Sequence, residues 1–155
     1  MTGKIEARLA ELGLTLPEAG TPIANYIPFT ITGTTVYVSG QVPRRDGAIW
    51  PTGKLGAGVA VATGQEGARA CFLAMLGHLK VAAGGDLDRV KRVLRITGYV
   101  SSTPDFTDQP LVVNGASDAA VAIFGEAGRH ARTAIGVSVL PGDASVEVEG
   151  IFELS

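Results

Sequence analysis

Hydrophobic side chains recur at helical spacing in three stretches of this 155-residue chain. Residues 62–83 carry one apolar stripe, which ends at the glycine pair 84–85. Residues 109–124 carry a second stripe, and residues 4–12 carry a shorter one. The pattern therefore predicts two long amphipathic helices and a short N-terminal helix.

Alternation of β-branched or aromatic residues with polar ones predicts five strands, at 25–31, 35–42, 89–100, 132–140 and 145–154. The first two flank Thr32-Gly33-Thr34, and the last two flank Pro141-Gly142-Asp143-Ala144, so each pair is typical of a hairpin. The order α-β-β-α-β-α-β-β, without repeats or a linker, predicts one α+β domain over 1–155 with both long helices on one face of the sheet.

Two regions lie outside this regular pattern. Residues 1–20 are interpreted as an extra N-terminal helix followed by a turn-rich lead-in. Residues 43–58 form a long segment dense in glycine and proline, which predicts a loop, and loops of that length in a compact domain are often functional.

The last two strands, taken as a hairpin, predict an unusual second face. If the turn is centred on Gly142-Asp143, the alternation places Thr133 and Ile135 against the helices and the small residues Ala134 and Gly136 on the opposite face. Small residues permit another backbone surface to approach closely. We interpret that face as a contact with a neighbouring subunit; an edge strand with small residues by chance is the alternative.

Arg132 and Glu147 lie on this second face. Arg132 is six residues from Ser138, which is about 20 Å along a strand, and the hairpin places Glu147 opposite Ser138. The two charges of one chain therefore cannot hold one small molecule. Either they are unrelated charges, with Arg132 in an ion pair with a glutamate such as Glu153, or the site lies between subunits.

Composition narrows the function classes. The chain is 46% apolar but only 18% charged, with a net charge of −2. This lacks the basic surplus of a nucleic-acid-binding domain and favours association with other copies. No apolar run has the ~18–20 residues that a membrane span needs, and no secretory signal is visible, so a cytoplasmic location is expected.

The residues that carry metal or thiol chemistry are few. A single cysteine, Cys71, excludes an intrachain disulfide and lies on the apolar stripe, so a core position is expected. His78 falls off that stripe and is predicted to be solvated. His130, two positions before Arg132, is predicted to lie in a loop, and a place at the mouth of the candidate site is the alternative. Two histidines without ligand spacing predict no metal site.

Several segments, in order, resemble the RidA/YjgF family of enamine/imine deaminases. They are Tyr26, Val38-Ser39-Gly40-Gln41-Val42-Pro43, residues 88–100, Asn114, and the closing run from Ala131 to Glu149. The resemblance covers nearly the whole chain from Tyr26 onward. It implies a RidA/chorismate-mutase-like mixed sheet and a homotrimer with clefts between its subunits.

The resemblance also implies an activity and a site. Members hydrolyse reactive 2-imino or 2-enamino acids, such as 2-aminoacrylate, to 2-keto acids and ammonium without a cofactor. Arg132 matches the arginine that binds the substrate carboxylate, Glu147 the glutamate that positions water, and Tyr26 a tyrosine of the cleft. Four further matches line the cleft: Ser39, Gly40, Asn114 and Ala134.

Departures from the family pattern leave alternatives open. Ala134 replaces a common cysteine, Gly136 replaces a common glutamate, and the chain is longer, as in a longer subgroup of the family. A non-catalytic module that binds a small carboxylate is one alternative. The endoribonuclease or translation-inhibitor activity attached to the family is another, although the charge balance does not favour it. The expected partners are a small carboxylate and two further copies of the chain, with no nucleic acid and no membrane.

Overall fold

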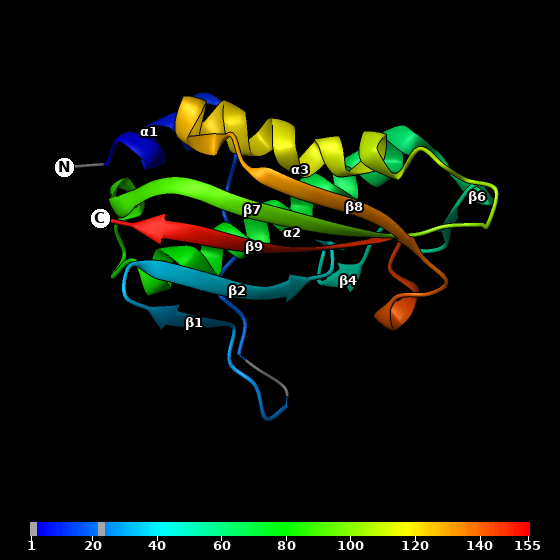
Figure 1. Cartoon of the computed structure of the whole chain (residues 1–155), viewed down its shortest axis with the longest axis horizontal. Helices are drawn as coiled ribbons and strands as arrows, with labels where there is room; N and C mark the ends of the chain where they lie inside the picture. Colours follow the sequence, from blue (N-terminus) through cyan, green and yellow to red (C-terminus); the bar gives the residue numbers. More distant parts are fainter. Residues whose placement is uncertain (1–2, 22–23) are drawn as a thin grey trace.

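The computed structural model describes residues 3–21 and 24–155, which form a five-stranded sheet with two long helices on one face (Figure 1). The helices are α1 Lys4–Glu11, α2 Val61–Ala82 and α3 Gln109–Phe124. The strands of the sheet are β1 Phe29–Thr32, β2 Thr35–Gln41, β7 Val90–Ser101, β8 Ala131–Val137 and β9 Val146–Leu154. Shorter elements are β3 Arg44–Arg45, β4 Ala48–Ile49, β5 Lys54–Leu55, β6 Gly58–Val59, and the 3-10 turns η1 Leu87–Arg89, η2 Gly125–Gly128 and η3 Pro141–Asp143.

The strand order is β1-β2-β9-β7-β8. β7 and β8 run parallel, and the other neighbouring pairs are antiparallel. Helix α2 packs on β2 and β9, whereas α3 packs on β7 and β8. The predicted α+β class and the mixed sheet with two long helices on one face are therefore confirmed.

The predicted C-terminal hairpin is wrong, because β7 lies between β8 and β9. Glu147 pairs with Tyr99 of β7 and not with Ser138. The turn at η3 thus joins two strands that are not neighbours in the sheet. A turn sequence shows that the chain reverses, but the partner of each strand is decided by long-range packing, here by the α3 crossover that makes β8 parallel to β7.

The predicted faces of β8 are also reversed. The residues of β8 expected on the open face pair with buried β7 residues, in the register Ile96↔Arg132, Gly98↔Ala134 and Val100↔Gly136. These small residues therefore lie under α3: a Cβ at Gly98 would collide with Val113, and one at Gly136 with Gln109. They allow the helix to approach the sheet, so the small side chains have a role within the chain itself.

A β-bulge in β7 explains a further error in the alternation. The register shifts between Val93 and Arg95, so that Val93 and Ile96, three residues apart, are both fully buried. Strict alternation places Val93 on the same face as Arg95. An extra residue in one strand shifts every later side chain to the other face relative to that expectation.

The core follows the predicted stripes of the two long helices. In α2 the stripe that ends before Gly84 and Gly85 is fully buried and includes Cys71, Phe72 and Met75. The short helix α1 is docked by Asp88, whose carboxylate accepts hydrogen bonds from the backbone N–H groups of Lys4 and Ile5, both at 2.8 Å. Among the described residues, no helix combines the length and the apolar character that a bilayer crossing requires.

The segment 43–58 is not a plain loop. It contains the antiparallel pair β3–β4 and the parallel pair β5–β6, each two residues long. Arg45 stacks on the indole ring of Trp50, with its guanidinium carbon 3.2 Å from the ring centroid. The segment is therefore built from local pairs that lie beside the main sheet.

Candidate functional site

The residues predicted to form one site lie in three places. Arg132, Asn114 and Ala134 lie at the β8 edge of the sheet, under α3. Tyr26, Gly40 and Glu147 line a cavity of about 620 Å³ on the β2–β9 side. Ser39 lines a separate cavity of about 310 Å³ on the open face. Within one chain, these residues do not form a single pocket.

Arg132 is held by α3. Its Nη1 donates to Asn114 Oδ1 at 2.7 Å and to Ser117 Oγ at 3.2 Å. Asn114 and Ser117 are three residues apart and therefore share one face of the helix. Arg132 is partly buried, and no carboxylate among residues 3–21 and 24–155 lies within 4.0 Å of it.

The alternative ion pair of Arg132 with Glu153 is therefore wrong. Glu153 pairs instead with Lys91, at 3.2 Å. Glu153 lies on the open face opposite Thr35, whereas Arg132 lies on the helix face of the sheet. Two side chains on opposite faces of a sheet cannot meet.

Sequence reasoning missed Ser117 as a direct partner of this arginine, and missed that His130 bonds to Ser117 behind it. His130 Nε2 lies 2.9 Å from Ser117 Oγ, and its Nδ1 lies 2.6 Å from the carbonyl oxygen of Gly128. Burial lowers the pKa of His130; the hydrogen bond to the Gly128 carbonyl oxygen opposes this, and the charge of Arg132 adds a smaller lowering. The signal was in the sequence: His130 and Arg132 are two residues apart at the start of a strand, a spacing that places side chains on one face.

Glu147, unlike Arg132, lies in an environment that disfavours its charged form. It is partly buried, and burial together with the neighbouring Glu149 raises its pKa. Its carboxylate packs against Gly40, where a Cβ would collide with Oε1. β2 has a register shift between Val38 and Gln41, which brings Gly40 to this position. Among the described residues, Glu147 forms neither an ion pair nor a side-chain hydrogen bond.

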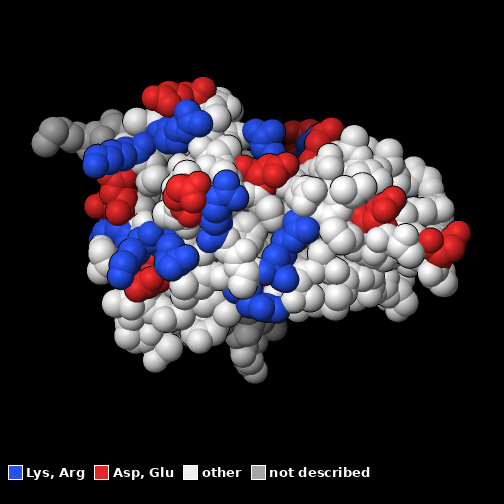
Figure 2. Space-filling view, turned by 45° about the horizontal axis from the view of Figure 1, so that its top comes forward, with Lys and Arg blue, Asp and Glu red and all other residues white. Residues whose placement is uncertain are grey.

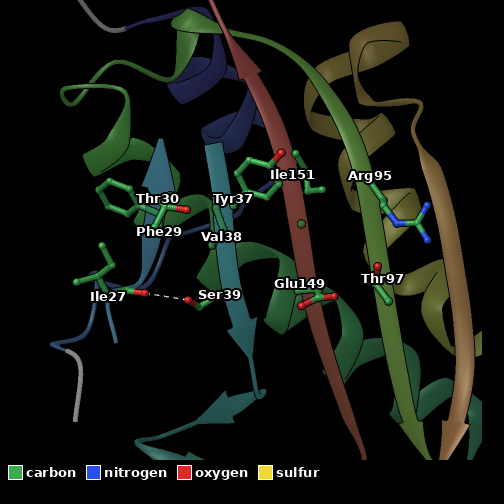
Figure 3. Close-up of a pocket in the computed structure, with 11 residues that line it drawn as sticks. Ile27, Phe29, Thr30, Tyr37, Val38, Ser39, Arg95, Thr97, Glu149 and Ile151 are labelled. Carbon is green, nitrogen blue, oxygen red and sulfur yellow. Dashed lines mark hydrogen bonds between the residues drawn. The ribbon is translucent and has the colours of Figure 1, made fainter. Parts of the chain in front are cut away.

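The open face of the sheet contains the smaller cavity (Figure 3). Tyr37 and Ile151 form its apolar part, and Thr97 and Glu149 lie side by side on neighbouring strands. Ser39 belongs to its rim, where its hydroxyl donates to the carbonyl oxygen of Ile27 at 2.9 Å. This face combines apolar and charged side chains and is not covered by a helix.

Tyr26 and Glu147 therefore share a cavity, whereas Arg132 lies far from both. In the sheet register, Arg132 is level with Gly150, two strands away, and Glu147 is three residues further along β9. At ~4.8 Å between strands and ~3.3 Å per residue, their Cα atoms are roughly 14 Å apart. Since they also point to opposite faces, one chain cannot bring both to one small substrate.

The other candidate residues are now placed. His78 is 6% exposed, so its predicted solvation is wrong; the lead-in segment, with Pro17 beside Gly77, covers this part of α2. Burial lowers the pKa of His78, and its Nδ1 has no hydrogen-bond partner among the described residues. Cys71 is fully buried, which confirms its predicted core position, and burial raises its pKa.

One group of acidic side chains could hold a cation. Glu6, Asp86 and Asp88 place one carboxylate oxygen each within 4.8 Å of one another. Asp88 caps α1, and Glu6 forms an ion pair with Lys80 at 3.3 Å. The arrangement therefore fastens α1 to the body of the protein, at a distance from the candidate site.

Comparison with known proteins places this geometry in a family. The family model described as "YjgF/chorismate mutase-like, putative endoribonuclease" matches residues 6–154. Protein TCP17 of Trypanosoma cruzi is 47% identical over 155 residues, which cover 99% of this chain and 96% of that protein.

Several solved structures are also similar, to different degrees. Atu1372 from Agrobacterium tumefaciens, a protein of unknown function, is 47% identical with a TM-score of 0.89, over 97% of this chain and 91% of that chain. A Shewanella oneidensis protein with the endoribonuclease name is 36% identical with a TM-score of 0.92, over 97% and 99% of the two chains. Escherichia coli TdcF, solved with bound serine, is 25% identical with a TM-score of 0.59, over 90% and 94%.

Fold and matches together define a small α+β protein of the YjgF/chorismate mutase-like class. The chain belongs to the RidA/YjgF family.

Proposed function

We propose that this protein is a cofactor-independent imine/enamine deaminase. It hydrolyses 2-imino or 2-enamino acids, such as 2-aminoacrylate, to 2-keto acids and ammonium, at a site shared between subunits of a homotrimer. The observation that carries the proposal is Arg132, a partly buried guanidinium that neutral groups hold in place and that has no carboxylate partner among the described residues.

Arg132 suits the capture of a substrate carboxylate. A guanidinium stays charged at every physiological pH and offers parallel N–H donors that match the two oxygens of a carboxylate. No acidic neighbour in the described part of the chain neutralises its charge, so it is available to an external anion. Asn114 and Ala134 border it and complete this half of the site.

Glu147 suits the activation of water. In the hydrolysis, a water oxygen bonds to the imine carbon while the carbon–nitrogen π bond breaks, and the carboxylate takes one proton from the water and passes it to the nitrogen. The hydroxyl group of the resulting carbinolamine then gives its proton to the nitrogen by the same route. The carbon–nitrogen bond then breaks, ammonia leaves, and the carbon–oxygen double bond of the keto acid forms. A carboxylate with a pKa raised by burial is a better proton acceptor than an ordinary one. Tyr26 borders the same cavity.

The separation of the two halves supports a site between subunits. Arg132 and Glu147 face opposite sides of the sheet in one chain, so both can act on one substrate only when different copies supply them. The open face of the sheet also exposes large apolar side chains, Tyr37 at 46% and Ile135 at 44%. Such a face is typical of a surface that another subunit covers.

A non-catalytic carboxylate-binding role is the second candidate. TdcF was solved with serine, which carries the same carboxylate group as the proposed substrate but no reactive imine. Arg132 alone is sufficient for binding of this kind. Turnover separates the two candidates, because only the deaminase needs Glu147.

The charge distribution favours a small carboxylate over RNA. The net charge is −2, and Figure 2 shows basic and acidic side chains interspersed on the face it presents. RNA-binding surfaces usually concentrate basic residues beside exposed aromatic ones.

The test is keto-acid release from 2-aminoacrylate generated by a coupled enzyme. We expect the wild-type protein to accelerate release over buffer, and Arg132→Ala to lower the acceleration at least about 100-fold, because the carboxylate loses its counter-charge. Arg129→Ala is the matched control. Arg129 lies three residues away in an exposed ion pair with Glu126, so its loss leaves activity unchanged.

Three outcomes are informative. Acceleration that depends on Arg132 supports the deaminase. Keto-acid binding that depends on Arg132, without any acceleration, supports the carboxylate-binding module instead. If the protein shows no binding and no acceleration, both candidates are overturned. Cleavage of RNA under the same conditions would then favour the endoribonuclease name.

A further inference from the structure

Both hydrogens on one nitrogen of Arg132 are occupied within the chain. Nη1 carries two hydrogens, and it donates to two acceptors of α3, Asn114 Oδ1 at 2.7 Å and Ser117 Oγ at 3.2 Å. Nε and Nη2 have no hydrogen-bond partner in the described part of the chain. The remaining edge, Nε–H with Nη2–H, is a two-donor fork that fits a carboxylate.

His130 determines the direction of the hydrogen bonds behind this fork. The carbonyl oxygen of Gly128 can only accept, so Nδ1 of His130, 2.6 Å away, carries a hydrogen. In the neutral ring Nε2 is then an acceptor, and the Ser117 hydroxyl, 2.9 Å away, donates to it. Ser117 thereby turns its lone pairs toward Arg132. The bonds run from Arg132 to Ser117, from Ser117 to His130, and from His130 to Gly128.

The surroundings favour the neutral ring that this direction requires. Burial lowers the pKa of His130 most, and the charge of Arg132 on β8 adds a smaller lowering; together they outweigh the hydrogen bond to the Gly128 carbonyl oxygen, which raises it. The charged residues of the adjoining η2, Glu126 and Arg129, pair with each other on the surface. On the other adjoining elements, Asp118 of α3 is exposed and Arg95 of β7 donates to Thr133 on the open face.

We propose that Ser117 and His130 are positioning residues that fix Arg132 with its Nε–Nη2 edge free for a substrate carboxylate. The inference rests on the proposed function and adds two residues to its binding half. A guanidinium already held by one nitrogen loses less conformational entropy when a ligand binds. Holding Arg132 in place before binding therefore increases its affinity for the ligand.

The experiment measures the affinity of the purified, assembled protein for 2-oxobutanoate, a stable 2-keto acid, by calorimetry. Ser117→Ala removes the bridge and is expected to weaken binding about threefold to tenfold. His130→Asn keeps a donor for Gly128 but loses the Ser117 contact, so it weakens binding similarly. His130→Gln places an acceptor near the position of Nε2 and should bind like wild type, with equal melting temperatures throughout.

An NMR titration of His130 provides a readout that a purely structural role would not change. The pKa of His130 is expected to rise in Arg132→Ala, because the neighbouring positive charge is gone. It is also expected to rise in the wild-type protein when 2-oxobutanoate binds, because the carboxylate offsets that charge, and not in Arg132→Ala.

The outcomes separate the inference from the proposed function. If the wild-type protein neither binds a keto acid nor accelerates its release, the proposed function is overturned; if it accelerates release without measurable binding, the same variants are compared by KM, and equal KM values overturn the positioning role. If it binds, but Ser117→Ala and His130→Asn bind equally well, the positioning role alone is overturned. A pKa of His130 that is the same with and without Arg132 also contradicts the inference.

Discussion

The two halves of the candidate site differ in how many hydrogen-bond and ion-pair partners the chain provides for their charged residue. At the β8 edge, Arg132 has two hydrogen bonds to α3, and a histidine supports one of its partners. On the β2–β9 side, Glu147 is partly buried with no ion pair or side-chain hydrogen bond among the described residues. An unpartnered, partly buried carboxylate costs stability, and such groups gather at functional sites. The comparison indicates that the described chain holds Arg132, the residue of the binding half, in place, whereas it provides no such partner for Glu147, the residue of the reactive half.

The largest expected effect comes from exchanging halves between copies. Arg132→Ala and Glu147→Gln are each expected to be inactive alone. When the two are unfolded and refolded together in equal amounts, about a quarter of all sites combine an intact Arg132 from one copy with an intact Glu147 from another. Keto-acid release should recover to about that fraction of wild type.

The matched control for this exchange is Arg132→Ala mixed with the double variant Arg132→Ala/Glu147→Gln, which should remain inactive. Activity that never recovers in the first mixture would show that both residues must come from one chain. This outcome would contradict the proposal that the site lies between subunits.

Arg132→Lys sharpens the binding half. Lysine keeps the positive charge but cannot offer a planar fork while it also holds Asn114 and Ser117. We expect affinity for 2-oxobutanoate to fall about tenfold or more, measured by calorimetry, with Arg129→Lys as control. Equal affinity of the lysine variant would show that charge alone captures the ligand.

Gly40→Ala tests the reactive half. The new Cβ would meet Glu147 Oε1, the mobile end of a side chain, so the carboxylate must move. Turnover should fall about threefold to tenfold, while keto-acid affinity changes less than about twofold, because Arg132 is untouched. Gly20→Ala adds a methyl group at the same cavity with nothing within 4 Å and serves as control. A loss of affinity as large as the loss of turnover would contradict the assignment of binding to Arg132 and of water activation to Glu147.

The smallest expected effect is on stability at acid pH. Burial lowers the pKa of His78, so the unfolded chain binds a proton there more readily than the folded one. The stabilisation is present above the ordinary histidine pKa and is lost as pH falls through the lowered folded value. Urea unfolding between pH 8 and 5 measures it, and His78→Met should flatten the dependence. An unchanged slope in that variant would assign the effect to His130 or to carboxylates.

Local sequence patterns predicted the elements well and their partners poorly. The stripe of α2 is visible because one face of a long helix is buried along its whole length. The partner of β8 is not visible in its own residues, because the pairing with β7 depends on the α3 crossover. Arg132 was therefore predicted on the wrong face, and the bulge near Val93 added a second shift that no alternation rule foresees.

The residues of the candidate site likewise divide into those that local motifs predict and those that only long-range packing reveals. The resemblance supplied Arg132, Asn114, Glu147 and Gly40, since each stands in a motif. Ser117 and His130 stand in no motif and become visible only when α3 is laid on β8. Their spacing to Asn114 and Arg132 was available in the sequence, but it becomes informative only once helix and strand are known to touch.

The burial of Cys71 has a practical consequence for these experiments. The chain has one cysteine, and it is fully enclosed, with a pKa that burial raises. A thiol in that state reacts slowly with maleimides or spin labels. A cysteine introduced at Val139, which is 64% exposed, could therefore carry a fluorophore selectively, and the native thiol would not have to be removed first.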